Sequence, residues 1–463
     1  MSSQGQQKFE AFREKYAFLS YDGFNSEVDS EGLKVHFHFN LSDQVHFSPG
    51  FRIPVKAFIT KNMMSKAINT SLIQHLFFQI GMIELISYWK AACPESILIK
   101  CGSLSEEQLL FWKKIYFKGL GEFFYTNEIT TSESDFVKIV SSGPVYHKES
   151  LALSDKVIIP IGGGKDSVVS LELIKKEFEA RPFILNPRGA SLETCFKAGY
   201  ASNTIAEVYR SLDSQLLRLN SEGYLNGHTP FSAMLAFYTL LVSALTGYKH
   251  IALSNESSAN EATVAGTDVN HQYSKSFEFE QDFRNYVNSF ISPDFNYFSF
   301  LRPLSELQIA MLFSRNVKYY PVFKSCNVGS KTDIWCGNCA KCLFAWTILS
   351  PFIPVNEMVQ IFGKNLYEDG KMIRYLKELT GMEEVKPFEC VGTIDEVNMA
   401  LQMFIKQHSN EKWPLLIDYY SNTSNFNSYR EFDSAAMLSR IETTHFLSEE
   451  FITLIREALR WKA

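Results

Sequence analysis

The chain has 463 residues, of which 46% are hydrophobic, and a formal net charge of −6. This length is typical of two or three domains, and the acidic balance argues against a broad basic surface for nucleic acid. The polar start of the chain lacks the apolar core of a signal peptide, and the apolar stretch 232–248 is interrupted by Ser, Thr and Gly. We therefore expect a cytoplasmic protein that binds neither nucleic acid nor a membrane. Its eight cysteines should be thiols or metal ligands.

Residues 1–150 contain no recognisable motif, and their patterns predict an N-terminal α/β or α+β domain. Strands are predicted at Lys34–Asn40, Val45–Pro54 and Ile97–Lys100, and helices at 71–91 and Glu106–Phe117.

Residues 151–350 alternate between strand and helix patterns. Strands are predicted at Val157–Ile161, Pro182–Leu185, His250–Ser254 and Tyr319–Phe323, and helices at Asp166–Phe178 and Phe231–Leu245. Repeated β-α-β units predict an α/β domain with a doubly wound parallel sheet. Ligands of such sheets bind at the carboxyl ends of the strands.

Residues 351–463 form a mostly helical C-terminal domain in this interpretation, after a boundary marked by Pro351 and Pro354. Helices are predicted at Asn356–Phe362, Lys371–Leu379, Asp395–Lys406 and Glu449–Trp461, and a loop at Ser421–Ser428.

A glycine-rich loop separates the strand Val157–Ile161 from the helix that follows it. Contiguous glycines let backbone N–H groups approach an anion, and the helix N-terminus adds free N–H groups and a positive dipole end. The loop therefore predicts a phosphate-binding site, in which Lys165 neutralises oxygens, Ser167 donates a hydrogen bond and Asp166 holds Mg²⁺. The candidate residues are Gly162, Gly163, Gly164, Lys165, Asp166 and Ser167. The alternative is a strand-to-helix turn without a ligand.

This loop matches neither the Walker A pattern nor the dinucleotide-binding fingerprint. It resembles the PP-loop of ATP pyrophosphatases, Ser-Gly-Gly-X-Asp-Ser, with Gly162 in place of the serine. The resemblance implies an adenine nucleotide alpha hydrolase-like fold, in which ATP is split into AMP and pyrophosphate while a substrate is adenylated. It also implies that groups after the second strand, including Asn186 and Arg188, hold adenine.

Four cysteines form a C-x9-C-x2-C-x2-C cluster. Four thiolates within so short a segment can close a tetrahedral zinc site without an open position, which indicates a structural role. The cluster comprises Cys326, Cys336, Cys339 and Cys342. An iron–sulfur cluster or free thiols are the alternatives. The cluster also resembles the zinc site of 7-cyano-7-deazaguanine synthases, although its first gap is longer.

Polar residues gather after the strand His250–Ser254, where an α/β enzyme places substrate contacts. The candidates are Glu256, Asn260, Glu261, His271, Tyr273 and Lys275; a solvated loop is the alternative. Arg302, in Arg302-Pro-Leu-Ser-Glu, is a candidate contact for a carboxylate or phosphate, with a surface ion pair as its alternative. Cys390 is either a buried apolar side chain or a proton donor.

Over essentially its whole length, the chain resembles the MurL family of ATP-dependent UDP-N-acetylmuramoyl-L-alanyl-L-glutamate epimerases. The resemblance is carried by the PP-loop and by two longer segments, Asn270-His-Gln-Tyr-Ser-Lys-Ser and Trp335-Cys-Gly-Asn-Cys-Ala-Lys-Cys. It implies that ATP and Mg²⁺ adenylate the terminal L-glutamate of a UDP-linked muramoyl dipeptide in peptidoglycan precursor synthesis. The Cα of that glutamate is then inverted.

The residues suggest roles for this chemistry. Lys165 stabilises charge during adenylation, Asp166 orients Mg²⁺, and His271 is the first candidate for proton transfer. Glu256 and Cys390 are the next candidates. The alternatives are an amidating or nitrile-forming PP-loop ligase, an RNA-modifying adenylating enzyme and a non-catalytic nucleotide-binding module.

Overall fold

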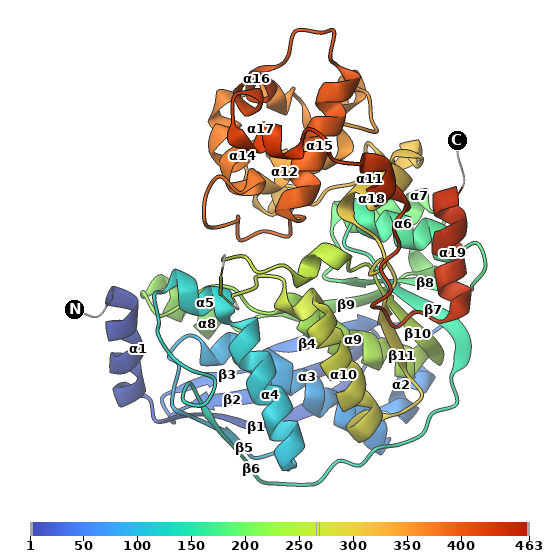
Figure 1. Ribbon diagram of the computed structural model, residues 1–463. Helices are drawn as coiled ribbons and strands as arrows, with labels where there is room; N and C mark the ends of the chain where they lie inside the picture. Colours follow the sequence, from blue (N-terminus) through green and yellow to red (C-terminus); the bar gives the residue numbers. More distant parts are fainter. Residues whose placement is uncertain (1–2, 265, 268, 461–463) are drawn as a thin grey trace.

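The computed structural model describes residues 3–264, 266–267 and 269–460. Its centre is one long mixed sheet, with helices packed around it and a separate group of helices above one end (Figure 1). None of the helices in the described residues has the length and apolar character needed to cross a bilayer.

Five parallel strands form the half of the sheet that carries the glycine loop. They are β7 (Ser154–Pro160), β8 (Ala180–Leu185), β9 (Ala206–Ser211), β10 (Tyr248–Leu253) and β11 (Asn296–Ser299). Their spatial order is β11-β10-β7-β8-β9, so the direction of winding reverses between β7 and β10. A crevice opens at such a reversal, outside the carboxyl ends of the strands.

The N-terminal strands extend this parallel half into a sheet of eleven strands within the described residues. They are β1 (Phe18–Val28), β2 (Gly32–Leu41), β3 (Val45–Phe47), β4 (Gly50–Pro54), β5 (Ser96–Ile99) and β6 (Lys138–Ser141). β4 pairs antiparallel with β9, with Gly50 opposite Ser211. The predicted parallel sheet is therefore one part of a larger mixed sheet, and β9 and its junction with β4 were not predicted.

Helices of the N-terminal and central segments share one hydrophobic core. Its most buried members are α3 (Ser71–Trp89) and α9 (Phe231–Thr246), which pack against each other. The carboxylate of Glu84 in α3 accepts two hydrogen bonds of 2.6 Å from Arg210 in β9 and one of 2.9 Å from Tyr238 in α9. This buried network fixes α3 to the parallel strands. The other helices here are α1 (Gln4–Lys15), α2 (Lys61–Ala67), α4 (Glu106–Gly119), α5 (Gly121–Thr126), α8 (Ser214–Ser221) and α10 (Phe277–Tyr286).

A second core packs helices of the central and C-terminal segments against the other face of the parallel strands. These helices are α6 (Lys165–Ile174), α7 (Gly189–Lys197), α11 (Glu306–Ser314), α12 (Ala340–Leu349), α13 (Val355–Phe362), α14 (Ile373–Thr380), α15 (Ile394–Gln407), α16 (Leu415–Ser421), α17 (Ser424–Tyr429), α18 (Ser434–Ser439) and α19 (Glu449–Arg460). The last helix leaves the orange helical group and returns to the sheet beside α6 (Figure 1), where the ring of Phe451 stacks on Phe178 at 4.5 Å. The two cores therefore cross the predicted boundaries at 150 and 350.

Most predicted elements are present with shifted ends, and two predictions are wrong. Tyr319–Phe323 is a turn that begins with the 3₁₀ segment Val317–Tyr319, because its apolar side chains pack against Phe313 and Trp335 without joining the sheet. Within the predicted loop Ser421–Ser428, α17 begins after Thr423, whose side chain caps it. Trp461, at the end of the last predicted helix, lies outside the described residues.

Candidate active site

A cavity of about 530 Å³ opens where the winding of the sheet reverses. Its walls come from the ends of β7, β8 and β10, the start of α9, and segments 271–275 and 324–327. The sequence-predicted residues that line it are Gly162, Gly164, Asp166, Ser167, Arg188, Glu256, His271, Lys275 and Cys390. The volume is typical of a small-molecule site.

Of the three glycines in the loop, Gly163 is the one that another residue could least easily replace. Gly163 has a φ of +89°, and a Cβ there would lie 2.8 Å from the backbone carbon of Ala190. Its carbonyl oxygen accepts a 2.9 Å hydrogen bond from the backbone N–H of Lys324. A Cβ at Gly162 would meet nothing within 4 Å, so the protein leaves room for the serine of the PP-loop pattern. Gly164 precedes the first residue of α6 as its N-cap.

Lys165 is buried and pairs with the carboxylates of Asp166 and Glu306, which both line the cavity. Burial by itself raises the pKa of Glu306 and outweighs the attraction of Lys165, so that this pKa is about 8. Burial also disfavours ionised Asp166, but the neighbouring Lys165 keeps the pKa of Asp166 below its usual value. Sequence reasoning missed Glu306, although it ends the quoted Arg302-Pro-Leu-Ser-Glu segment.

The two residues predicted to hold adenine have different environments. Arg188 is exposed at the N-terminus of α7 and lines the cavity. Asn186 has a φ of +55°, and its side-chain oxygen accepts a 2.7 Å hydrogen bond from the backbone N–H of Arg210. Asn186 therefore ties β8 to β9 through its side chain.

Across the cavity, Cys390 meets two cationic side chains. Its Sγ lies 3.2 Å from the Nζ of Lys275 and interacts with the imidazole of His271, whose Nδ1 contacts the carboxylate of Glu122 in α5. Burial alone would raise the pKa of Cys390, but Lys275 and His271, with a further contribution from Lys341, lower it to about 6.

His271 is correspondingly held in its protonated form. Burial lowers the pKa of an imidazole, yet the hydrogen bonds to Cys390 and Glu122 raise the pKa of His271 to about 9. The neighbouring His228 lies 3.3 Å from Glu122, and burial together with the charge of His271 lowers its pKa to about 4. Glu122, His228 and His271 thus lie together with Lys275 and Cys390, and we refer to these five residues as the Cys390 group.

Residues 385–392 carry Cys390 into the cavity because they are attached to the central segment. Lys386 donates its backbone N–H to the carbonyl of Thr263 at 3.0 Å, and its Nζ pairs with Glu261. The side chain of Gln272 donates to the carbonyl of Val391 at 3.2 Å. Glu261, predicted to contact substrate, thus helps to hold the segment that carries Cys390.

Two more predicted residues differ sharply in their partners. Arg302 is 1% exposed and donates to the carbonyl of Glu256 at 2.6 Å and to the carboxylate of Glu280. Glu256 itself is 4% exposed and lines the cavity, but no residue of 3–264, 266–267 and 269–460 donates a hydrogen bond to its carboxylate. Arg302 therefore fixes the backbone that presents Glu256.

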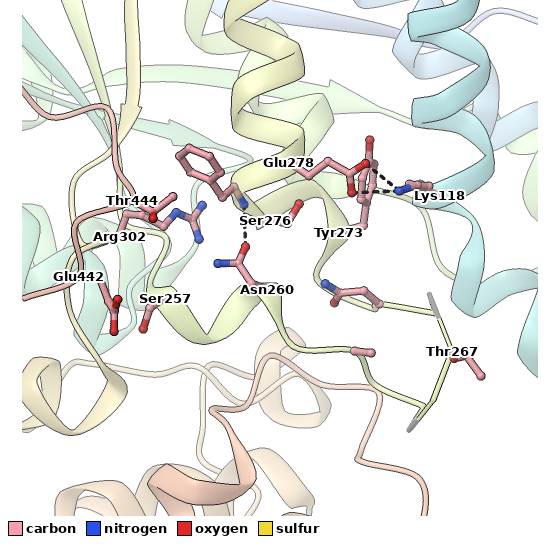
Figure 2. Close-up of a pocket in the computed structure, with 13 residues that line it drawn as sticks. Lys118, Ser257, Asn260, Thr267, Tyr273, Ser276, Glu278, Arg302, Glu442 and Thr444 are labelled. Atoms are coloured by element: carbon pink, nitrogen blue, oxygen red, sulfur yellow. Dashed lines mark hydrogen bonds and ion pairs between the residues drawn. The ribbon is translucent and has the colours of Figure 1, made fainter. Parts of the chain in front are cut away.

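The stretch of chain that follows β10 lines this cavity and also a second one, of about 630 Å³. Figure 2 shows Arg302 and Glu442 on one side of Asn260, and Tyr273 with the ion pair Lys118–Glu278 on the other. Three predicted substrate contacts, Asn260, Tyr273 and Arg302, face this second cavity. The glycine loop and Cys390 both line the smaller cavity, and neither lines the second one.

The four clustered cysteines have the geometry of a metal site. Their Sγ atoms lie 3.8 Å apart for Cys326 and Cys339, 3.7 Å for Cys336 and Cys342, and 3.5 Å for Cys339 and Cys342. A tetrahedral site with Zn–S bonds of about 2.3 Å places its sulfurs about 3.8 Å apart. Since Lys324 and Lys341 line the cavity beside these cysteines, an ion here would fix part of its wall.

Comparison with known proteins identifies the family. Models of the MurL N-terminal domain and the MurL C-terminal domain match residues 11–300 and 322–432. The chain belongs to the MurL family. No solved structure matches it.

Three relatives of this MurL chain carry the name UDP-N-acetyl-alpha-D-muramoyl-L-alanyl-L-glutamate epimerase. The relative from Xanthomonas oryzae pv. oryzae is 33% identical over 341 residues, which are 72% of this chain and 75% of the relative. The relative from a Micromonospora species is 33% identical over 71% of this chain and 74% of its own length. The relative from Salinispora tropica is 32% identical over 74% of this chain and 77% of its own length.

Proposed function

We propose that this MurL chain is an ATP-dependent epimerase. It adenylates the α-carboxylate of the terminal L-glutamate of UDP-MurNAc-L-Ala-L-Glu, inverts Cα and releases the D-glutamate product with AMP and pyrophosphate. The observation that carries the proposal is the single cavity that joins a glycine loop to the Cys390 group. Its parts supply the two things the reaction requires, an anion site for the nucleotide and groups that exchange a proton.

The nucleotide half of the proposal rests on the PP-loop resemblance. The backbone N–H groups of the loop and the N-terminus of α6 suit a pyrophosphate. Asp166 lines the cavity as an ionised carboxylate, which supports our assignment of Asp166 as the ligand that holds Mg²⁺ against the pyrophosphate. Lys165 is engaged with Asp166 and Glu306, so we assign it to holding Asp166 in place.

Adenylation makes the glutamate Cα acidic. The α-nitrogen is part of an amide, so it cannot form a Schiff base with a carbonyl cofactor. Removing the Cα proton beside an ionised carboxylate would place two negative charges on adjacent atoms. An acyl adenylate has lost that carboxylate charge, and the carbanion can delocalise as an enolate. The cationic side chains of Lys275, Lys324 and Lys341 line the cavity and favour this negative charge.

We assign a structural role to the cysteine cluster and propose that it holds Zn²⁺, on the strength of its sulfur–sulfur distances. A reaction that consumes ATP fits a cytoplasmic location.

The test is to incubate the protein with Mg-ATP and UDP-MurNAc-L-Ala-L-Glu in D₂O. We expect AMP, pyrophosphate and a product that carries D-glutamate with deuterium at Cα. AMP formation with consumption of ammonia would instead identify a ligase, and AMP that depends on added RNA would identify an RNA-modifying enzyme. Absence of AMP would leave only nucleotide binding.

A further inference from the structure

The proposed function requires a group that exchanges the Cα proton. Three residues that line the cavity are candidates for this role: His271, Glu256 and Cys390. His271 is held as a cation between Glu122 and Cys390, so it has no free lone pair with which to accept a proton. Glu256 has an unpartnered carboxylate within the described residues. Cys390 is the third candidate, and it alone sits beside two cations.

A thiolate beside two cations suits this task. A free thiol is mostly protonated at neutral pH, whereas cationic neighbours favour the thiolate. Here Lys275 Nζ lies 3.2 Å from the sulfur, and His271 contacts it from the side of Glu122. Cys390 also lines the cavity that we propose as the substrate site.

Glu256 supplies a second, independent indication that the substrate binds between these groups. Glu256 is 4% exposed and lines the same cavity, and its carboxylate has no donor among the described residues, so a bound ligand can supply one. Lys275 feels the negative charge of both Cys390 and Glu256, so it lies near both groups.

From this geometry we infer that the thiolate of Cys390 exchanges the Cα proton on one face of the adenylated glutamate. His271, held by Glu122, acts as a positioning residue for the sulfur. The inference rests on the proposed function and names the group within it that handles the proton.

The step balances as a proton transfer. When the sulfur acts as base, the Cα–H bond breaks, an S–H bond forms and the electron pair moves into the activated carboxyl group as an enolate. A donor on the opposite face of Cα then forms the new Cα–H bond, and we assign this role to Glu256, which lines the same cavity. In the reverse direction, the carboxylate of Glu256 removes the Cα proton, and the thiol of Cys390 then gives its proton to the enolate.

The decisive experiment measures D-glutamate product per AMP for Cys390→Ala and Cys390→Ser, with Mg-ATP and the UDP-linked dipeptide in D₂O. We expect AMP formation to persist by hydrolysis of the adenylate while the ratio falls about 100-fold or more. Cys101→Ser, outside the cavity, should leave the ratio unchanged. A ratio within tenfold of the original protein would overturn the inference. The inference would also be overturned if the Cys390 variants kept the original thermal unfolding midpoint but lost AMP formation and inversion to the same degree, since Cys390 would then serve adenylation.

A second measurement needs no active variant. Iodoacetamide alkylation of Cys390 in the unsubstituted protein, followed across pH by mass spectrometry, should have its midpoint near pH 6, and Lys275→Gln should raise it. A midpoint above pH 8 in the unsubstituted protein would contradict the inference, even if both Cys390 variants failed to fold. Failure of the unsubstituted protein to form AMP would overturn the proposed function instead, so the two failures are distinct.

Discussion

The two walls of the cavity are built in opposite ways. The glycine loop is continuous: within residues 160–167 a strand ends, the chain turns at Gly163 and α6 begins. The opposite wall draws Glu122 from the N-terminal segment, His271 and Lys275 from the central segment and Cys390 from the C-terminal segment. The glycine loop therefore needs only a local backbone shape, whereas the Cys390 group depends on three distant segments meeting.

The largest effect should come from the four-cysteine cluster, which neighbours the cavity residues Lys324 and Lys341. Cys339→Ser removes one of four clustered sulfurs, and we expect loss of one bound zinc and about 4 kcal/mol or more of stability, because metal sites hold their cores together. Metal content and chemical denaturation measure this, with Cys101→Ser as the control. An unchanged zinc content and midpoint would show that the cluster does not hold metal.

The next largest effect should come from a change in the glycine-loop wall, and it should be confined to that wall. Asp166→Asn removes the carboxylate that we propose as the Mg²⁺ ligand, and we expect AMP formation to fall about 10²–10³-fold, the usual cost of losing one charge-stabilising group. Asp155→Asn, at the other end of β7 and exposed, is the matched control. Equal AMP formation in both variants would remove Asp166 from the nucleotide site.

A pair of alanine substitutions tests the shape of the loop. Gly163→Ala puts a Cβ against the backbone of Ala190 at a positive φ and should cost about 1–3 kcal/mol, with weaker nucleotide binding. Gly162→Ala enters open space and should leave both quantities nearly unchanged. Thermal unfolding and titration with ATP distinguish the two, and equal losses would contradict the described loop.

The smallest expected effect concerns the opposite wall, which contains Cys390 and His271. The thiolate–imidazolium pair exists only above the pKa of Cys390, about 6, and below that of His271, about 9. Inversion per AMP should therefore rise through pH 6 and fall through pH 9. Glu122→Gln removes a negative partner of His271 and should move the upper limb down by about one pH unit.

The matched control for this last variant is Glu107→Gln, exposed at the start of α4. If Glu122→Gln and Glu107→Gln gave the same pH profile, Glu122 would have no role in holding His271.

Many elements could be predicted because their signals are local. The strand before the glycines, α6, α9 and β10 follow from apolar periodicity and turn residues, and the four cysteines follow from their spacing. Tyr319–Phe323 was mistaken for a strand because a short apolar run has the same composition whether it joins a sheet or packs as a turn. Ser421–Ser428 was mistaken for a loop because Ser, Thr and Asn are also helix caps.

The sequence by itself determined the glycine loop, the cysteine cluster and the parallel strands β7, β8 and β10, since each depends on neighbours a few residues away. Only the tertiary structure decided that β4 joins β9, that Glu306 meets Lys165, that Asn260 and Tyr273 face another cavity, and that Cys390 lies between Lys275 and His271. These contacts join residues tens to hundreds of positions apart, and their charges and pKa values exist only once burial and packing have brought them together.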